Sequence, residues 1–292
     1  MNSHIDLRKR LAAPAIVVAP GVYDALTASI AVTAGFEALY LSGAAIAYTK
    51  LGRPDIGLVS MSEVLDTLMN IRERVDAALI VDADTGYGNA LIVERTVNLF
   101  ERAGANAIQI EDQSIPKRCG HLADKSIISA SEMIGKIKAA VDARQSDKTL
   151  IVARTDAAAV QGFAAARERA EAFAEAGADV IFLEAPQDIN QLTAVGHLLD
   201  GRVPLMANMV EGGRTPVLPA SQLEAMGFSL VIFPGGVVRA LARTAQEFYG
   251  VLASEGTTES FRARMFDFDG VNKLLGAADI LARGKRYEGG DR

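Results

Sequence analysis

The chain has 292 residues, of which half are hydrophobic and 23% are charged, and its formal net charge is −6. This composition predicts a folded protein with a large core, and the negative charge argues against nucleic acid as its main partner. The single cysteine allows no internal disulfide and predicts a reducing, cytoplasmic location. No stretch approaches the roughly 20 apolar residues of a membrane span, so we expect no membrane partner.

Eight short apolar runs follow one another along the chain, with amphipathic helical stretches such as 62–75 and 164–177 between them. Four of the runs follow a glycine that ends a helix, where glycine takes the left-handed conformation at little cost. The runs are apolar on both faces, as strands buried in a parallel sheet require. The predicted strands lie within residues 15–20, 34–43, 78–84, 103–112, 149–155, 176–185, 203–209 and 226–235.

This strand–helix alternation predicts an α/β fold, a (β/α)8 TIM barrel that makes one domain of residues 1–292. The alternative is an open doubly wound sheet, which needs a glycine-rich phosphate turn after its first strand. The stretch "APGVYDAL", where that turn would lie, has a single glycine and lacks the dinucleotide signature. The barrel is therefore the predicted fold.

Polar side chains gather where the otherwise apolar strands end. In a TIM barrel, these carboxyl ends form the face that carries the chemistry. A barrel with a purely structural role has no reason to place polar groups there on strand after strand. The residues at these ends are Tyr40, Ser42, Gly43, Asp82, Asp84, Glu111, Asp112, Arg154, Thr155, Asp156, Glu184 and Asn208.

The stretch "VDADTGYGN" places Asp82 and Asp84 two residues apart, which on a strand directs both carboxylates to one face. Two such carboxylates repel each other unless a cation joins them, and oxygen ligands favour Mg²⁺, with Mn²⁺ as an alternative. Glu111 and Asp55, the latter in "GRPDIG", could complete the site directly or through water. The alternative is that the two aspartates cap the next helix or pair with arginines.

Two other strand ends suggest anion binding. Arg154 at a barrel mouth needs an anionic partner, which is either a substrate carboxylate or a neighbouring acid such as Glu184. Backbone N–H groups around Ser42 and Gly43 could hold a carboxylate. A tight turn that needs glycine is an equally good explanation of the second feature.

The stretch "IPKRCGHLADK", residues 115–125, holds the single cysteine on a predicted loop after the fourth strand. Cys119 lies there among Lys117, Arg118, His121 and Lys125, and such positive charge favours a thiolate or a bound anion. A solvated basic loop with an inert cysteine is the alternative. Charge alone does not decide between them.

Seven segments together resemble one known family: "YLSG", "GRPDIG", "VDADTGYGN", "IEDQ…PKRCGH", "ARTDA", "EAP" and "NMVEGG.TP". In this order, from about residue 10 to 240, they are similar to the isocitrate lyase/phosphoenolpyruvate mutase superfamily. The loop "KRCGH" is the most specific of them, and it resembles the carbon–carbon lyase branch that includes 2-methylisocitrate lyases and 2,3-dimethylmalate lyases. The resemblance implies an enzyme, an oxo-acid-lyase.

The resemblance also implies roles for individual residues. Asp82 and Asp84 would hold Mg²⁺, with Asp55 and Glu111 binding through water. Cys119 would be the general acid on a gating loop from Lys117 to His121 that closes over the substrate. The implied catalytic residues are Cys119, Tyr40, Lys117, Arg118, His121 and Arg154, and the implied substrate-binding residues are Ser42, Gly43, Ala44, Gly120, Glu184 and Asn208.

The implied reaction is a Mg²⁺-dependent cleavage of a small anionic substrate, a 2-hydroxy di- or tricarboxylate, into an α-keto acid and a carboxylic acid. Tyr40 is our candidate for handling the hydroxyl proton. The stretch "NMVEGGRTP" looks more like that of dimethylmalate lyases, which favours an alkylmalate over the tricarboxylate 2-methylisocitrate. Oxaloacetate decarboxylation or hydrolysis, or phosphonomutase-type chemistry, is the alternative on the same scaffold.

The family further places its last barrel helix on a neighbouring subunit and assembles as a homotetramer. Residues 239–292 exceed what one closing helix needs, and they include the stretch "FDGVNKLLGAADILARG". We therefore expect extra C-terminal helices in this segment, which pack on, or are exchanged with, a neighbouring subunit.

Overall fold

The computed structural model describes residues 5–120, 122 and 124–288. The chain divides into two compact units, Met1–Val238 and Arg239–Arg292, which are described separately. Among the described helices, none combines the length and the hydropathy that a bilayer crossing needs.

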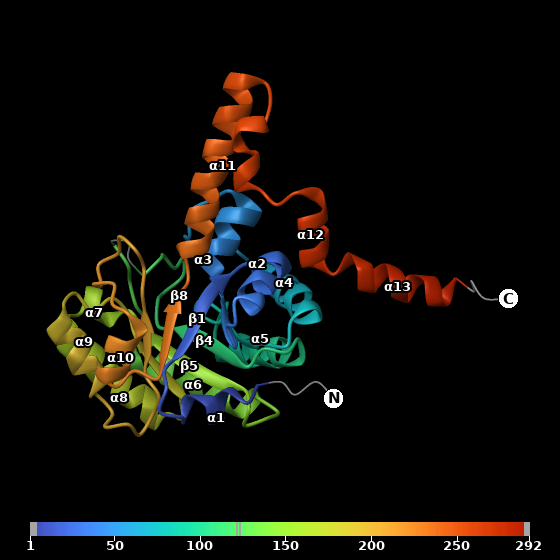
Figure 1. The fold of residues 1–292 in the computed structure, drawn as a ribbon. Helices are drawn as coiled ribbons and strands as arrows, with labels where there is room; N and C mark the ends of the chain where they lie inside the picture. The colour runs from blue at the N-terminus through green and yellow to red at the C-terminus, as the bar shows by residue number, and fades with distance from the viewer. Residues whose placement is uncertain (1–4, 121, 123, 289–292) are drawn as a thin grey trace. The chain divides into compact units, whose positions relative to one another are not determined.

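The first unit is built around eight parallel strands (Figure 1). The hydrogen-bonded order is β6-β5-β4-β3-β2-β1-β8-β7, and β6 meets β7 through one parallel bridge between Ile181 and Leu205. The ring is thus a nearly closed barrel, which confirms the predicted (β/α)8 fold. The strands are β1 (Val17–Val22), β2 (Ala38–Leu41), β3 (Ala78–Asp82), β4 (Ala107–Glu111), β5 (Leu150–Thr155), β6 (Val180–Leu183), β7 (Met206–Asn208) and β8 (Leu230–Phe233).

Helices connect the strands, and polar caps fix where several of them begin. Ser60 accepts a hydrogen bond from the backbone N–H of Glu63 while the Glu63 side chain accepts from the N–H of Ser60, which satisfies two otherwise unpaired donors at the start of α4. The helices of this unit are α1 (Leu7–Leu11), α2 (Ala25–Thr33), α3 (Gly43–Ile46), η1 (Ala47–Leu51), α4 (Met61–Arg74), α5 (Ala90–Arg102), α6 (Ala130–Ala143), α7 (Ala157–Val160), α8 (Phe163–Glu175), α9 (Ile189–Gly196) and α10 (Ala220–Ala225).

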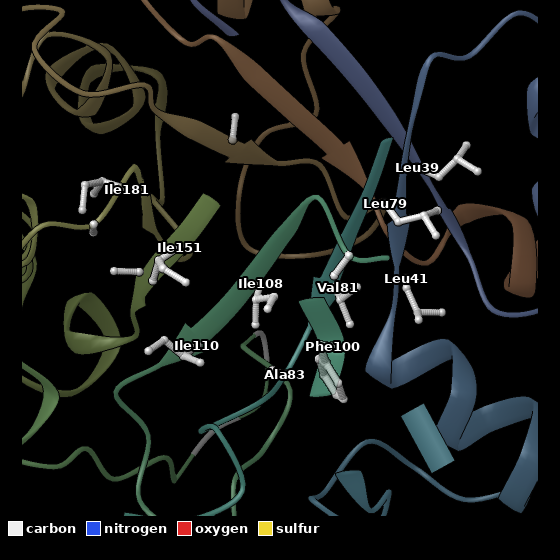
Figure 2. Packing of buried hydrophobic residues seen from close by; sticks show 14 of the residues in the cluster. Leu39, Leu41, Leu79, Val81, Ala83, Phe100, Ile108, Ile110, Ile151 and Ile181 are labelled. Carbon is white, nitrogen blue, oxygen red and sulfur yellow. The ribbon is translucent and has the colours of Figure 1, made fainter. Parts of the chain in front are cut away.

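Alternate residues of each strand face two different cores. In β2, Leu39 and Leu41 belong to the larger cluster, in which the strands pack against the helices (Figure 2). Ala38 and Tyr40 belong to a second cluster inside the barrel. Burial of each large apolar side chain contributes roughly 1.5–3 kcal/mol, so strands packed on both faces are held firmly. This rigidity positions the polar residues at the strand ends.

The second unit is helical. It comprises most of α11 (Gly236–Glu255), followed by η2 (Glu259–Arg264), α12 (Phe268–Leu275) and α13 (Ala277–Tyr287). Phe261 is buried in it, with its ring centroid 5.5 Å from that of Phe248. Other large apolar side chains of the unit are exposed, among them Phe266, Phe268, Leu281 and Tyr287.

Candidate active site

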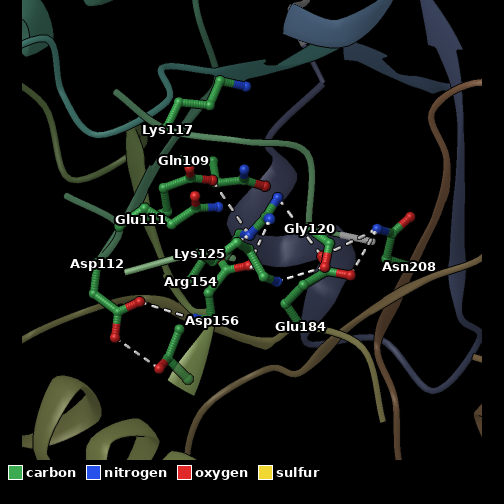
Figure 3. Close-up of polar contacts among 12 residues, drawn as sticks. Gln109, Glu111, Asp112, Lys117, Gly120, Lys125, Arg154, Asp156, Glu184 and Asn208 are labelled. Carbon is green, nitrogen blue, oxygen red and sulfur yellow. Dashed lines mark hydrogen bonds and ion pairs between the residues drawn. The ribbon is translucent and has the colours of Figure 1, made fainter. Parts of the chain in front are cut away.

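The carboxyl ends of the strands hold a cluster of buried charged and polar side chains (Figure 3). Burial of an unpaired charge is expensive, so each charged group here needs a partner or a ligand. The buried members are Asp55, Asp82, Asp84, Gln109, Glu111, Lys117, Arg154, Asp156 and Glu184.

Asp82 and Asp84 converge, but not by the alternation of strand side chains that we predicted. β3 ends at Asp82, and Asp84 has a left-handed backbone with a φ of 47°. A Cβ atom on Gly43 would lie 3.3 Å from Asp82 Oδ2 and 3.4 Å from Asp84 Oδ1. Both carboxylates therefore face the start of α3, and a turn rather than the strand pleat brings them together.

The residues after β2 lie beside these two aspartates. Ser42 is buried, and its hydroxyl accepts a hydrogen bond of 3.2 Å from the N–H of Ala45, so it caps α3. Gly43 lacks the side chain that would contact the two aspartates, and Ala44 follows it on the helix. The tight turn is thus present, and it leaves room beside the carboxylates.

Lys117 joins the carboxylates from the loop side. Its Nζ lies 2.6 Å from Asp55 Oδ1 and 2.6 Å from Asp84 Oδ1. Burial alone would lower the pKa of Lys117, but the carboxylates of Asp84 and Asp55 outweigh it and raise that pKa well above its usual value. For the Asp84 carboxyl, burial acts in the opposite direction and raises its pKa to about 7, although the positive charge of Lys117 opposes this shift.

The donor chemistry of this wall fits a divalent cation. Asp82 and Asp84 offer carboxylate oxygens, the ligands that Mg²⁺ prefers, and Gly43 places no side chain against them. Among the described residues, however, no three His, Cys, Asp or Glu side chains form a ready metal cluster. Asp55 pairs instead with Lys117, and Glu111 pairs with Arg154.

Tyr40 is connected to the aspartates through Gln109. The Tyr40 hydroxyl donates a hydrogen bond of 3.0 Å to Gln109 Oε1, and Gln109 Nε2 donates one of 3.2 Å to Asp82 Oδ1. Burial, followed by the nearby Asp82 carboxylate, raises the pKa of Tyr40 well above its usual value. Sequence reasoning missed Gln109; the available signal was an amide in the middle of the apolar run "AIQIE".

Arg154 is surrounded by carboxylates. Its Nε lies 2.9 Å from Asp156 Oδ2 and 3.3 Å from Glu111 Oε2, and its Nη1 lies 3.6 Å from Glu184 Oε2. The ion pair with a neighbouring acid, which we gave as one alternative, is therefore present. Burial opposes the charged form, but Asp156 and Glu111 outweigh it and raise the pKa of Arg154 well above its usual value.

Two polar atoms near Arg154 lack a hydrogen-bond partner among the described residues. They are Glu111 Oε1 and Asn208 Oδ1, and both are buried. Asn208 Nδ2 donates a hydrogen bond of 3.2 Å to Glu184 Oε2, so one end of this amide is fixed. Buried polar atoms are nearly always paired, and these two therefore mark where a polar ligand would bind.

Asp112 braces the Arg154 side of the site, although sequence reasoning gave it no role. Its Oδ2 accepts a hydrogen bond of 2.7 Å from the hydroxyl of Thr155, and its Oδ1 accepts one of 2.8 Å from the N–H of Asp156. Arg169 donates to the same carboxylate from α8. The signal in the sequence was the pair of polar strand ends "IED" and "RTD".

The cysteine loop lies against this cluster. A Cβ atom on Gly120 would fall 2.5 Å from Arg154 Nη2 and 2.7 Å from the Glu184 side chain, so the loop backbone contacts both residues. The N–H of Cys119 donates a hydrogen bond of 3.1 Å to the carbonyl of Asp55, and the residue is half-buried. The Arg118 side chain is 45% exposed and pairs at 3.7 Å with Asp124, so it points partly to solvent.

The structure thus gathers most of the residues that the sequence suggested. His121, which the sequence also suggested, lies outside the described residues. Asp55, Asp82, Asp84, Lys117 and Gly43 share one wall, while Glu111, Arg154, Glu184, Asn208 and Gly120 share another.

The fold and the polar mouth define a (β/α)8-barrel protein with buried charged side chains at the carboxyl ends of its strands. The family model described as phosphoenolpyruvate phosphomutase matches residues 7–251, and the chain belongs to this family, within the PEP mutase/isocitrate lyase superfamily. The chain is 41% identical to a 2,3-dimethylmalate lyase of Eubacterium barkeri, over 96% of each chain. It is 45% identical to a 2-methylisocitrate lyase of Aeropyrum pernix, over 95% of this chain and 88% of the relative.

Solved structures agree with these relatives. A crystal structure of 2,3-dimethylmalate lyase superposes with a TM-score of 0.90 at 34% identity, over 98% of this chain and 95% of that chain. A structure of oxaloacetate acetylhydrolase with 3,3-difluorooxalacetate gives 0.91 at 31%, over 98% and 97%. A phosphonopyruvate hydrolase in complex with oxalate and Mg²⁺ gives 0.87 at 29%, over 97% and 98%. The chain is an enzyme of the carbon–carbon lyase class.

Proposed function

We propose that the enzyme cleaves the C2–C3 bond of a 2-hydroxy dicarboxylate of the 2,3-dimethylmalate type in a Mg²⁺-dependent reaction, with 2-methylisocitrate as the alternative substrate. The products are an α-keto acid and a carboxylic acid. The observation that carries the proposal is the position of the cysteine loop, whose Gly120 touches Arg154 and Glu184 at the barrel mouth. The proposal requires a proton donor and cationic groups beside an anion site, and this position of the loop supports it.

Asp82 and Asp84 would hold the metal directly, and Asp55 and Glu111 would hold it through water. Convergence of the two aspartates beside Gly43 supports this assignment. A bound Mg²⁺ supplies a Lewis acid that polarises the hydroxyl and carboxylate of a 2-hydroxy acid. Lys117 contacts Asp55 and Asp84 at 2.6 Å, so its ammonium would share these carboxylates with a bound metal.

The residues around the substrate would orient it. Arg154 and the backbone of residues 42–44 bind the end that becomes the keto acid. Glu184 and Asn208 line the far side, while Gly120 and His121 bind the carboxylate of the other product. The unpaired Asn208 Oδ1 and Glu111 Oε1 support a polar ligand at this position.

The chemistry would proceed as a retro-aldol cleavage. The proton of the C2 hydroxyl leaves to a base, and Tyr40 is our candidate for handling it. Because its pKa is raised, Tyr40 stays a neutral phenol, which can orient the hydroxyl or relay its proton while it is hydrogen-bonded to Gln109. The C2–C3 bond breaks, C2 becomes the keto carbon, and the electron pair stays on C3 as a carboxylate enolate. Lys117 and Arg118 stabilise this charge, and the thiol of Cys119 protonates C3. Loop closure excludes water that would compete for the enolate.

A substrate panel tests the proposal. We expect 2,3-dimethylmalate, and more weakly 2-methylisocitrate, to release a keto acid with Mg²⁺, and we expect EDTA to stop the release. Turnover of oxaloacetate alone would contradict the proposal. It would favour the hydrolase or decarboxylase alternative, which the structural likeness to oxaloacetate acetylhydrolase suggests.

We further propose that residues 239–292 pack on a neighbouring subunit of a homotetramer. The exposure of Phe266, Phe268, Leu281 and Tyr287 supports this, because large apolar side chains are rarely left in water in such number. A cytoplasmic location stays a prediction from the single thiol.

A further inference from the structure

The loop that carries Cys119 leaves the barrel and returns to it through a narrow stem. Gln113 and Ile127 form an antiparallel bridge, and the N–H of Ser114 donates a hydrogen bond of 2.9 Å to the carbonyl of Ser126. The stem fixes the two ends of the loop. It does not by itself fix residues 118–120, which lie in the middle of the loop and include the cysteine.

Gln113 holds this middle part from one side. Its Nε2 donates a hydrogen bond of 2.8 Å to the carbonyl of Arg118, and its Oε1 accepts one of 2.9 Å from the N–H of the same residue. The side chain is buried, so water does not compete for these bonds. Gln113 therefore binds both polar groups of the residue that directly precedes Cys119.

Lys125 holds the middle part from the other side (Figure 3). Its ammonium donates to the carbonyl of Gly120 at 2.5 Å and to Asp156 Oδ1 at 2.7 Å, and its side chain is 1% exposed. Asp156 also accepts two hydrogen bonds from Arg154, of 2.9 and 3.1 Å. The residue after Cys119 is thus tied through Lys125 to the acid that orients Arg154.

We propose that Gln113 and Lys125 are positioning residues, which together hold the backbone on both sides of Cys119 so that its thiol stays docked at the barrel mouth. Lys125 also couples docking of the loop to the orientation of Arg154, because both cations share Asp156. The inference deepens the proposed function and rests on it for the role of the thiol. The anchors themselves can be measured without any turnover.

The rate at which iodoacetamide alkylates Cys119 reports the position of the loop. This thiol is the single one in the chain, so mass spectrometry assigns all modification to it. Reaction from a transiently open loop follows the open population. Loss of a buried pair of hydrogen bonds, or of a charge-assisted one, shifts that population by about tenfold or more. We expect Gln113→Met and Lys125→Met to raise the alkylation rate by about that factor.

Matched variants separate a change in the position of the loop from other effects of the substitutions on the alkylation rate. Gln113→Met changes no charge, so its effect cannot arise from a changed ionisation of the thiol. Lys125→Arg keeps the charge and should restore part of the wild-type protection. Lys138→Met and Gln145→Met replace exposed residues of the same types and should react like wild type. In turnover, we expect kcat of both anchor variants to fall more than KM rises.

Wild-type alkylation rates in folded Gln113→Met and Lys125→Met would overturn the inference, even if the wild-type enzyme cleaves alkylmalates. Faster alkylation in both variants would sustain it, even if no substrate of the panel is cleaved and the proposed function fails. If Lys125→Met does not fold, Gln113→Met, which leaves the ion pairs around Arg154 intact, decides the question alone.

Discussion

Gly120 lies where the cysteine loop contacts the barrel mouth, and a methyl group there has no room. In Gly120→Ala, the new Cβ would fall 2.5 Å from Arg154 Nη2 and 2.7 Å from Glu184. These side chains cannot move freely, because both are buried and Arg154 pairs with Asp156 and Glu111. Overpacking of this kind costs about 1–3 kcal/mol, which lowers the ratio of docked to undocked loop by about 5- to 150-fold.

The assay is release of keto acid from 2,3-dimethylmalate with Mg²⁺, together with thermal unfolding. We expect kcat/KM to fall by up to this factor while the melting temperature hardly changes, because the loop undocks and the core stays intact. Gly135→Ala is the matched control, since no atom lies within 4 Å of a Cβ at this exposed helical position. Wild-type kcat/KM in Gly120→Ala would refute the docked arrangement.

Two further predictions concern the metal and the C-terminal unit. Mg²⁺ at about 100 times its Kd should stabilise the wild-type protein against thermal unfolding by about 2.7 kcal/mol. Asp84→Asn should abolish this gain, because a ligand carboxylate is lost. Equal stabilisation of both proteins would exclude Asp84 as a metal ligand. Phe268 is 82% exposed, and we propose that it packs on a neighbouring subunit. Phe268→Glu should therefore lower the mass measured by light scattering from that of a tetramer, without unfolding the barrel. An unchanged mass would contradict packing through this side chain.

The fold was predictable because its signals are local. Short apolar runs, four of which follow a glycine that ends a helix, located the strands to within a few residues. Polar residues at the ends of those runs then located the mouth, since parallel strands place their carboxyl ends on one face. Asp82, Glu111, Arg154 and Asn208 all occupy strand ends in the structure.

The contacts inside the site were less predictable, because they depend on turns and on long-range pairs. Asp84 lies close to Asp82 because Asp84 itself has a left-handed backbone, which strand alternation did not suggest. Lys125 pairs with Asp156 and Gln113 pairs with Arg118 only because the loop folds back onto the barrel. A basic cluster in the sequence gives no sign of which cations are buried and which, like Arg118, remain partly in solvent.

The role of the thiol is the central claim, and turnover of Cys119→Ser tests it most directly. Serine keeps the size of the side chain, but its hydroxyl is a far weaker acid and cannot readily protonate the carbon of the enolate. General acid catalysis contributes about 10²- to 10⁴-fold, so we predict a fall of that size in kcat with little change in KM. Keto-acid release from Cys119→Ser at the wild-type rate would contradict the account.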